Sequence, residues 1–133
     1  MGDMGHAVAR TLREGGHRVL AALEGRSERT RALAASANVE DVGNLPALVS
    51  RADLLLSVMP PAEATGFAAL TASAIRTTNA KPVFLDCNAI APATTRAIGQ
   101  AIDAAGGVFV DGGIIGAPPG RRTPTRLCVS GPD

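Results

Sequence analysis

Short apolar runs alternate along the chain with longer segments that have helical periodicity. The apolar runs have the length of strands and carry few charges, which is typical of parallel strands covered on both faces. They lie at residues 17–23, 39–42, 52–59, 82–87, 108–111 and 126–130. The run at 52–59 is the most apolar, and Pro60 and Pro61 end it. The pattern predicts a strand at each of these places and a loop at 112–124.

The segments between these runs begin and end with helix-capping residues. Ser27 precedes an acidic first turn, and Asn44 precedes a proline, which suits the first turn of a helix. Glycine pairs starting at Gly15 and Gly106 are typical of helix ends. Strands and helices that alternate with short connections favour a parallel sheet. We therefore predict an α/β fold of the Rossmann type, a doubly wound, mostly parallel sheet with helices on both faces.

Composition and charge narrow the possible partners. The 133 residues, 46% of them hydrophobic, suit one domain that spans residues 1–133. The net charge is +1, and the two arginine clusters contain no aromatic residues, so we expect no nucleic-acid partner. No membrane span or signal peptide is recognisable, which favours a cytoplasmic protein. Cys87 and Cys128 each lie in a strand-like run and are expected to be buried free thiols.

Gly2 and Gly5 precede and open the first helix with the spacing of a dinucleotide-binding turn. They correspond to the second and third glycines of G-x-G-x-x-G, whose first glycine would lie upstream of Met1. Glycine lets a pyrophosphate approach the backbone, and the helix start supplies N–H donors. Two glycines also occur in ordinary tight turns, so this turn alone is a weak indication. We predict cofactor contacts from Gly2, Met4 and Gly5.

The segment after the strand at 17–23 carries an acidic and a basic candidate for the ribose of a cofactor. Glu24 follows Gly5 by 19 residues, near the spacing of an acidic ribose ligand, which favours NAD. Arg26 and Ser27 instead suit the 2′-phosphate of NADP. Because further arginines make this region positive, we favour NADP and predict contacts from Arg26 and Ser27. A solvated start of a helix is the alternative.

Polar or tightly turning residues also follow the later strands, at the sheet edge where doubly wound folds bind ligands. Met59 and Pro60 end a buried strand where the nicotinamide half of a cofactor would pass, although a plain strand stop also explains Pro60. Asn88 suits either a ligand contact or a turn, and both roles stay open. We predict cofactor contacts from Met59, Pro60 and Asn88. Substrate-side contacts are predicted for Gly112 and Gly113.

The remaining reactive residues do not form a catalytic set. His6 is expected to face solvent in the first helical turn, and His17 is expected to have a structural role. Neither lies at metal-ligand spacing from a cysteine or carboxylate, so no metal site is predicted. Lys81, the only lysine, precedes a strand and so lies at the wrong end of the sheet for a catalytic acid. The catalytic residue is therefore not assigned.

Together, these segments resemble the phosphogluconate dehydrogenase and β-hydroxyacid dehydrogenase superfamily. Residues 2–5 are similar to the end of its G-x-G-x-M-G turn, and residues 57–61 to its strand ending in Leu-Pro. Residues 86–94 resemble its D-x-S-T-x-x-P-x-T segment, with Asn88 at the serine-like position. Residues 109–116 match the place of its D-A-P-V-S-G-G substrate loop. Segments 23–30 and 111–119 resemble a bacterial branch of NAD(P)-dependent oxidoreductases in which an all-helical domain follows.

The resemblance implies an NAD(P)-dependent dehydrogenase or reductase that transfers hydride between the cofactor and a small hydroxy or carbonyl substrate. It also implies a catalytic lysine and a helical domain downstream of Asp133, with a homodimer as the full-length protein. The substrate loop of the family has a carboxylate-binding serine where this chain has Ile115, which argues against a simple β-hydroxyacid substrate.

Three alternatives to this activity remain. The chain could be a non-catalytic NAD(P)-binding module, because it contains candidate cofactor contacts but no identified proton donor. Imine reduction is the alternative within the enzymes, since related imine reductases share this domain. A methyltransferase is the third, and it would have an antiparallel final hairpin and no loop at 86–88.

The resemblance further implies a strand ahead of Met1, in the centre of a sheet with strand order 3-2-1-4-5-6. Without that strand, the strand at 17–23 lacks a neighbour and the helices on both sides face a gap. We therefore expect the intact protein to begin upstream. We also expect residues 1–133 alone to be poorly stable or unable to bind the cofactor.

Overall fold

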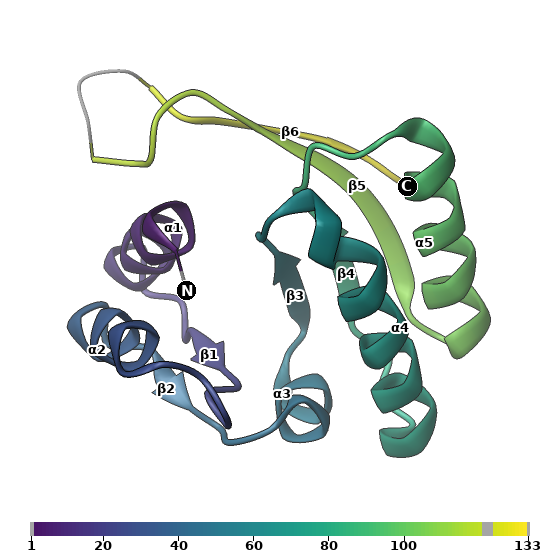
Figure 1. Cartoon of the computed structure of the whole chain (residues 1–133), viewed down its shortest axis with the longest axis horizontal. Helices are drawn as coiled ribbons and strands as arrows, with labels where there is room; N and C mark the ends of the chain where they lie inside the picture. Colours follow the sequence, from purple (N-terminus) through teal and green to yellow (C-terminus); the bar gives the residue numbers. More distant parts are fainter. Residues whose placement is uncertain (1, 121–123, 133) are drawn as a thin grey trace.

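A computed structural model describes residues 2–120 and 124–132, and helices and strands alternate along the chain. The helices are α1 (Asp3–Glu14), α2 (Glu28–Ser36), α3 (Leu45–Arg51), α4 (Pro61–Thr78) and α5 (Pro92–Ala105). The strands are β1 (Leu20–Ala21), β2 (Glu40–Asp41), β3 (Leu54–Ser57), β4 (Val83–Asp86), β5 (Val108–Ile115) and β6 (Arg126–Ser130). Figure 1 shows α1 and α2 on one side of the strands and α4 and α5 on the other. This α/β architecture is the one predicted.

The residues that cap the helices do so as the sequence indicated. The Ser27 side chain accepts a hydrogen bond from the amide of Thr30 at the start of α2. Asn44 accepts one from the amide of Ala47, at 3.0 Å, at the start of α3. Gly106 ends α5 with φ of +100°, a conformation that side chains other than glycine rarely adopt. Local capping thus fixes where these helices begin or end.

The strands form two separate sheets. β1 pairs in parallel with β2, and the second sheet has the order β3-β4-β5-β6. Its first three strands are parallel, whereas β6 is antiparallel to β5. Within residues 2–120 and 124–132, no ladder joins β1 to β3. β1 therefore has no strand neighbour on that side, as the sequence analysis expected.

Each sheet has its own hydrophobic core. The smaller core joins α1, α2 and the first sheet, and consists of Ala9, Leu23, Ala34, Ala37 and Val39. The larger core lies between the second sheet and helices α3, α4 and α5, with Phe84 fully buried at its centre. The two sets share no residue. Three of the five residues of the smaller core are alanines, and α4 contributes four alanines to the larger core, so these helices can lie close to the strands.

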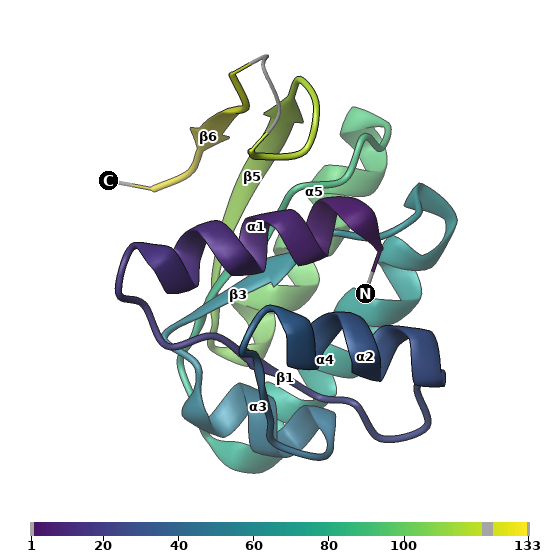
Figure 2. The ribbon, with the colours of Figure 1, turned by 90° about the vertical axis from the view of Figure 1, so that its left-hand side faces the viewer.

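The carboxyl ends of the parallel strands gather at one edge of the molecule, and α1 begins there. Figure 2 shows β1 and β3 running in the same direction, with α1 lying across β3. The start of α1 lies toward the carboxyl end of β3 in the same view. The Gly2–Gly5 turn is therefore at the edge where the sequence analysis placed the other candidate residues.

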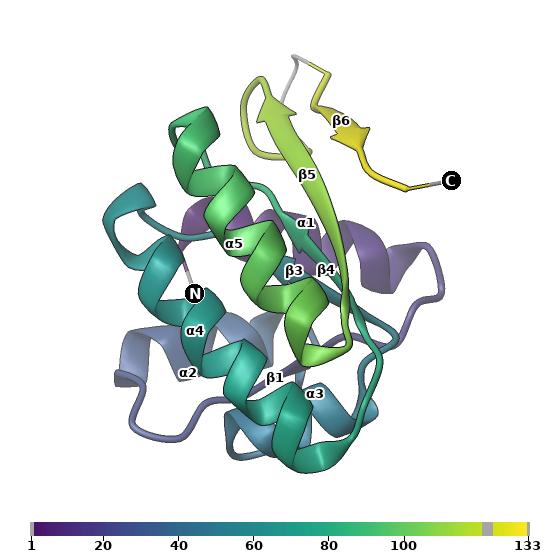
Figure 3. The ribbon, with the colours of Figure 1, turned by 90° about the vertical axis from the view of Figure 1, so that its right-hand side faces the viewer.

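The last two strands differ from the prediction in three ways. β5 continues to Ile115, so residues 112–115 belong to a strand and not to the predicted loop. β6 is antiparallel to β5, which is one of the two features expected of a methyltransferase. The other expected feature, the lack of a loop at 86–88, is not found, because that loop is present. Cys128 is exposed, not buried, because β6 is an edge strand with every residue exposed. Figure 3 shows β6 beyond β5, away from α4 and α5.

Other boundaries shift modestly. The most apolar run, predicted as a strand over 52–59, forms a strand only over Leu54–Ser57. α4 extends beyond its predicted end near residue 75 to Thr78, where Asn79 adopts the left-handed conformation with φ of 54°. Among the described residues, no helix is both long and apolar enough to cross a membrane.

Candidate functional site

The start of α1 leaves backbone amides available beside open space. Gly2 is the N-cap, and the first helical hydrogen bond runs from the amide of His6 to the carbonyl of Gly2, at 2.9 Å. The amides that precede this bond are the ones that a helix cannot satisfy internally. A Cβ atom built on Gly2 would meet nothing within 4 Å, so the backbone is accessible there. This arrangement suits an anionic group such as a phosphate.

Polar contacts join both ends of α2 to the first turns of α1. Arg29 lies 3.6 Å from Asp3, and His6 Nε2 lies 3.0 Å from Ser36 Oγ. His6 was expected to face solvent, but it is half-buried because α2 lies against its ring. The predicted residues Arg26 and Ser27, at the start of α2, are thereby brought to the same side of the molecule as Gly2.

The arginines around α2 have different roles. Arg31 donates to the carbonyl of Leu23 at 2.6 Å and also contacts Asp41, so it ties α2 to the strand ends. Arg26 is exposed, and its side chain has no hydrogen bond or ion pair within the described ranges. Its guanidinium is therefore available to a ligand. Glu24, the acidic alternative, is also exposed.

A buried polar network joins the ends of β3 and β4. Asn88 donates through Nδ2 to Ser57 Oγ at 2.8 Å and to Asp86 Oδ1 at 2.6 Å. The backbone amide of Asn88 also donates to Asp86 Oδ1, at 2.9 Å. Asn88 Oδ1 accepts the amide of Met59 at 2.8 Å. The side chain therefore connects two strand ends, which is the turn role of the two roles left open by the sequence.

Asp86 is the most unusual member of this network. It is only 1% exposed, and its second carboxylate oxygen, Oδ2, is buried with no hydrogen-bond partner in the described residues. Burial raises the pKa of its carboxyl group, the hydrogen bonds from Asn88 oppose this shift, and the nearby charge of Asp111 adds to it. The carboxyl therefore ionises less readily than an exposed aspartate.

A pocket of about 440 Å³ opens between the ends of β4 and β5 and the start of α5. Its lining includes the predicted residues Asn88, Gly112 and Gly113, together with Ile114. The two glycines differ, because a Cβ on Gly112 would lie 2.7 Å from Leu85 Cδ1, whereas one on Gly113 would meet nothing within 4 Å. Gly112 is thus required for packing, and Gly113 leaves the pocket open.

Two charged residues of this pocket were not among the predicted contacts. Arg96 lies on α5 and Asp111 on β5, and both line the pocket while having no ion pair within the described ranges. The sequence could have indicated Arg96, because it follows Pro92 by four residues and so lies in the first turns of the helix after β4. Cys87 also lines the pocket, and burial raises the pKa of its thiol to about 11.

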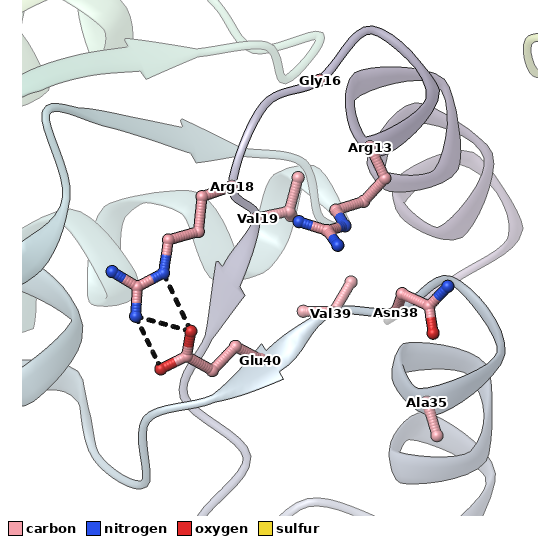
Figure 4. Close-up of a pocket in the computed structure, with 8 residues that line it drawn as sticks. All are labelled: Arg13, Gly16, Arg18, Val19, Ala35, Asn38, Val39 and Glu40. Atoms are coloured by element: carbon pink, nitrogen blue, oxygen red, sulfur yellow. Dashed lines mark hydrogen bonds and ion pairs between the residues drawn. The ribbon is translucent and has the colours of Figure 1, made fainter.

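A larger pocket of about 640 Å³ lies at the opposite edge of the molecule (Figure 4). It is lined by residues at the end of α1, the end of α2 and the amino ends of β1 and β2: Arg13, Gly16, Arg18, Val19, Ala35, Asn38, Val39 and Glu40. Arg18 and Arg51 hydrogen-bond to Glu40 and hold the pKa of its carboxyl group below the usual value. None of the predicted site residues lines this pocket, so its size does not make it the cofactor site.

The structure thus gathers the predicted residues in two groups at one edge. Gly2, Met4, Gly5, Arg26 and Ser27 lie around the starts of α1 and α2, and Met59, Pro60, Asn88, Gly112 and Gly113 lie at the ends of β3, β4 and within β5. In the described part of the chain, no three His, Cys, Asp or Glu side chains are arranged to hold a metal ion.

Comparison with known proteins identifies similar domains. A family model for the NAD-binding domain of 6-phosphogluconate dehydrogenase matches residues 1–133. No curated protein matches the chain. Among solved structures, a conserved protein of unknown function, described as structurally similar to 3-hydroxyacid dehydrogenases, is 26% identical with a TM-score of 0.81. The match covers 96% of this chain and 46% of that one.

Two named enzymes have the same fold at lower identity. Mycobacterium tuberculosis 3-hydroxyisobutyrate dehydrogenase, solved with L-serine, is 22% identical with a TM-score of 0.78, over 99% of this chain and 44% of the enzyme. Streptomyces aurantiacus imine reductase is 22% identical with a TM-score of 0.74, over 98% of this chain and 45% of the enzyme. The chain spans less than half the length of each of these structures.

Proposed function

The chain belongs to the family of NAD-binding domains of 6-phosphogluconate dehydrogenase, and on this premise we propose that it binds NADP for an oxidoreductase reaction. The reaction is hydride transfer between the cofactor and a small hydroxy or carbonyl substrate. The observation that carries the choice of cofactor is Arg26, an exposed guanidinium with no ion pair among the described residues, just ahead of α2, whose Arg29 contacts Asp3 at the start of α1.

The start of α1 fits the pyrophosphate of the cofactor. The amides of the first turn are free to donate, and the positive end of the helix dipole favours an anion there. Gly2 and Gly5 would let the pyrophosphate approach the backbone, and Met4 lies in the same turn. A larger side chain at Gly2 would occupy the open space beside the turn.

Arg26 and Ser27 fit the 2′-phosphate that distinguishes NADP from NAD. Arginine binds phosphate through two parallel hydrogen bonds, and the Arg26 guanidinium has no partner among the described residues that would compete. The Ser27 hydroxyl caps α2 by accepting the amide of Thr30, and its O–H, which donates to Thr30 Oγ1 at 3.2 Å, would turn to donate to the phosphate beside Arg26. Glu24 would favour NAD, and no contact of the Glu24 side chain within the described ranges orients it toward α1.

The second group of residues would face the nicotinamide and the substrate. When bound, NADP supplies or accepts the hydride. Met59 and Pro60 would border the nicotinamide, and the network of Asn88 fixes the position of Met59. Gly113 keeps the adjacent pocket of about 440 Å³ open to a small substrate, and Ile114 gives it an apolar wall. Gly112 lets β5 lie close to Leu85 of β4 beside this pocket.

The activity, substrate and partners of a whole enzyme are also proposals, because the chain spans less than half of the similar structures. We propose that residues 1–133 are the cofactor domain of a bacterial, cytoplasmic oxidoreductase that works as a homodimer. The catalytic residue and a helical domain would lie outside residues 1–133.

Imine reduction is the second candidate, and one observation favours it. Ile115 stands where the resembling family has a carboxylate-binding serine, and Ile114 gives the pocket an apolar wall, so a carboxylate would have only the charge of Arg96 to bind it there. A non-catalytic NAD(P)-binding module is the third. A panel of alcohols and imines, assayed against NADPH binding, tests these candidates, because binding without turnover of any substrate favours the module or a truncated enzyme.

The choice of cofactor is tested by titrating the whole oxidoreductase proposed above, of which residues 1–133 are the cofactor domain, with NADPH and NADH while following nicotinamide fluorescence. We expect Arg26→Ala to weaken NADPH binding by about 10- to 100-fold, since a charge-assisted hydrogen bond is worth about 1.5–3 kcal/mol. NADH binding should be unchanged. Arg76→Ala, at an exposed arginine near the end of α4, is the matched control. Equal losses for both cofactors, or tighter binding of NADH by the unaltered chain, would contradict the assignment to NADP.

A further inference from the structure

The pocket of about 440 Å³ lies where the start of α5 meets the second half of β5. Only residues 106–107 separate the two elements, so they run side by side in opposite directions (Figure 3). Gly99 marks the side of α5 that touches the strand, because a Cβ built on it would lie 2.9 Å from Phe109 Cδ1. The residues that precede Gly99 in α5 therefore lie beside those that follow Phe109 in β5.

Arg96 and Asp111 place opposite charges on the two walls of this pocket. Arg96 precedes Gly99 by three residues, and residues three apart share one side of a helix. Asp111 follows Phe109 by two residues, and alternate residues share one face of a strand. Both side chains line the pocket, and both residues are exposed. The helical wall thus carries a cation, and the strand wall carries an anion.

These two charges are not neutralised within the described part of the chain. Arg96 and Asp111 form no ion pair or hydrogen bond with each other, and neither side chain has another such partner in residues 2–120 and 124–132. Gly113 is next on the same face of β5, and a Cβ built on it would meet nothing within 4 Å. A ligand in the pocket can therefore meet both charges, and electrostatic complementarity requires that it carry a negative and a positive group.

We propose that Arg96 and Asp111 bind the two ends of a small zwitterion, namely an amino acid or the imino acid that is reduced to it. Arg96 would bind the carboxylate through charge-assisted hydrogen bonds, and Asp111 would bind the cationic nitrogen. The assignment rests on the proposed function in its imine-reducing form, and it names the substrate class of the pocket.

Both charges of the pocket are used by such a substrate and by its product. Reduction adds the hydride that NADPH supplies to the carbon of the protonated C=N bond, and the π electron pair of that bond moves to nitrogen. The resulting amine takes up a proton from water, so substrate and product both present a cationic nitrogen to Asp111. The carboxylate stays on Arg96 and takes no part in the step. A hydroxyacid would lack the cation, and a simple imine would lack the anion.

The test titrates three probes into the whole oxidoreductase, of which residues 1–133 are the cofactor domain, with and without NADPH. Norvaline, tested as each enantiomer, carries both charges. Pentanoate is norvaline without its ammonium group, and butylamine is norvaline without its carboxylate. NMR shifts of the Gly113 amide report binding and need no turnover. We expect the preferred enantiomer of norvaline to bind at least about fivefold more tightly than either single-charge probe, the factor that corresponds to about 1 kcal/mol for a partly exposed ion pair.

Two conservative variants assign each charge to its residue. Arg96→Gln should weaken the binding of norvaline and pentanoate at least about fivefold and leave that of butylamine unchanged. Asp111→Asn should weaken the binding of norvaline and butylamine by a similar factor and leave that of pentanoate no weaker. Arg76→Gln, at an exposed arginine near the end of α4, is the matched control and should change none of the three. The NMR spectrum of each variant shows whether the fold is intact.

Equal affinity of the three probes would overturn the proposal. So would an intact variant that loses all three probes alike, because shape and not charge would then select the ligand. Tighter binding of norvaline by Asp111→Asn would also overturn it, since Asp111 would then repel the carboxylate. NADPH titration of the same samples separates this result from the proposed function. Preference for norvaline without NADPH binding would support the pocket and contradict the oxidoreductase, whereas NADPH binding without that preference would overturn only the zwitterion site.

Discussion

At the scale of single residues, Asn88 does more than the sequence could assign to it. Its carboxamide is buried, and it bonds to the ends of two strands and to the carboxylate of Asp86. A buried polar network of this kind is stable only when every member keeps its partners. The ends of β3 and β4, where the nicotinamide side of the site is proposed, therefore depend on this one side chain.

We expect Asn88→Ala to destabilise the fold by about 1–3 kcal/mol, because it leaves the Met59 amide and the Ser57 hydroxyl without partners and removes one of the two hydrogen bonds to Asp86 Oδ1. The pKa of Asp86 should rise further, since the side-chain hydrogen bond from Asn88 that opposes its upward shift is lost, while the backbone amide of residue 88 still donates to Asp86 Oδ1. Urea denaturation of the variant measures the loss of stability. Gln100→Ala, at an exposed position of α5, is the control and should change stability little. Equal stability of the two variants would show that the network contributes nothing.

The raised pKa of Asp86 also has a defined effect on stability. A carboxyl whose pKa is higher in the folded protein than in the unfolded chain binds its proton more tightly when folded. Its contribution to stability is therefore full below the ordinary aspartate pKa of 3.8, and is lost as the pH rises through the higher folded value. Glu40 changes stability with pH in the opposite direction. Because the pKa of its carboxyl group is lowered in the folded protein, its contribution to stability is lost as the pH falls.

The two cysteines should differ strongly in reactivity. Cys87 is buried with a thiol pKa of about 11, whereas Cys128 is exposed on β6. Since the thiolate is the reactive form, a rise of the pKa from 9.0 to about 11 lowers the thiolate fraction about 100-fold near neutral pH. We expect iodoacetamide to label the native Cys128→Ser variant at least about 100-fold more slowly than Cys87→Ser.

Mass spectrometry of the labelled proteins measures these rates. Labelling of Cys87 should accelerate about tenfold per pH unit up to about pH 11, because deprotonation limits the reaction. Comparable rates for the two single-cysteine variants would mean that the pocket exposes the thiol of Cys87 more than the structure indicates. Labelling in urea, where both thiols are accessible, provides the reference.

At the scale of elements, two glycines within helices separate the effect of close packing on stability from the effect of helix propensity. A Cβ on Gly99 in α5 would lie 2.9 Å from Cδ1 of Phe109, whose ring centre is 6.4 Å from that of Phe84. A Cβ on Gly66 in α4 would meet nothing within 4 Å. Gly99 therefore sets how closely α5 approaches the sheet, whereas Gly66 has no such role.

We expect Gly66→Ala to stabilise the protein by up to about 1 kcal/mol, because alanine is the better helix former. Gly99→Ala should instead destabilise it, since overpacking against an aromatic ring costs about 1–3 kcal/mol and exceeds the gain in propensity. Chemical denaturation of the two variants side by side gives the comparison. If both variants were stabilised equally, the Phe109 ring would have moved aside at no cost.

At the scale of the whole molecule, the central feature is the separation of the two cores. One core holds α1, α2 and the first sheet, and the other holds the second sheet with α3, α4 and α5. An ion pair between Arg51 of α3 and Glu40 of β2 connects them, at 2.6 Å. Both of its side chains are partly exposed, and such surface pairs add little stability. The halves are therefore expected to unfold with limited coupling.

We expect two unfolding transitions that do not coincide. In a urea series followed by amide exchange, Ala34 in the smaller core should lose protection at a lower urea concentration than Phe84 in the larger core. Val39→Ala should lower only the first transition and Phe84→Ala only the second. A single transition that both variants shift equally would show that the halves fold as one unit. A cooperative melt together with tight NADPH binding by residues 1–133 alone would contradict the expectation that this chain is poorly stable or unable to bind the cofactor.

The candidate site could be predicted in outline because strand ends are visible in the sequence. Alternating apolar runs located the strands, and the carboxyl ends of parallel strands must share an edge, so Gly2, Arg26, Asn88 and Gly113 could be placed together. The individual roles could not be assigned. Arg31 binds the carbonyl of Leu23 and contacts Asp41, whereas Arg26 has no ion pair among the described residues. Which arginine reaches these partners depends on the tertiary structure, and local sequence does not encode it.

The sequence by itself determined the α/β class, most helix bounds and the family, since periodicity, capping residues and motifs act over short distances. Only the tertiary structure decided what depends on neighbours distant in sequence. Cys128 is exposed because no layer covers β6, residues 112–115 continue β5 because β6 pairs with them, and Asn88 is held by Ser57, 31 residues away. The division into two sheets is of the same kind, because strand pairing depends on which strand edges meet and not on the apolar pattern of any one strand.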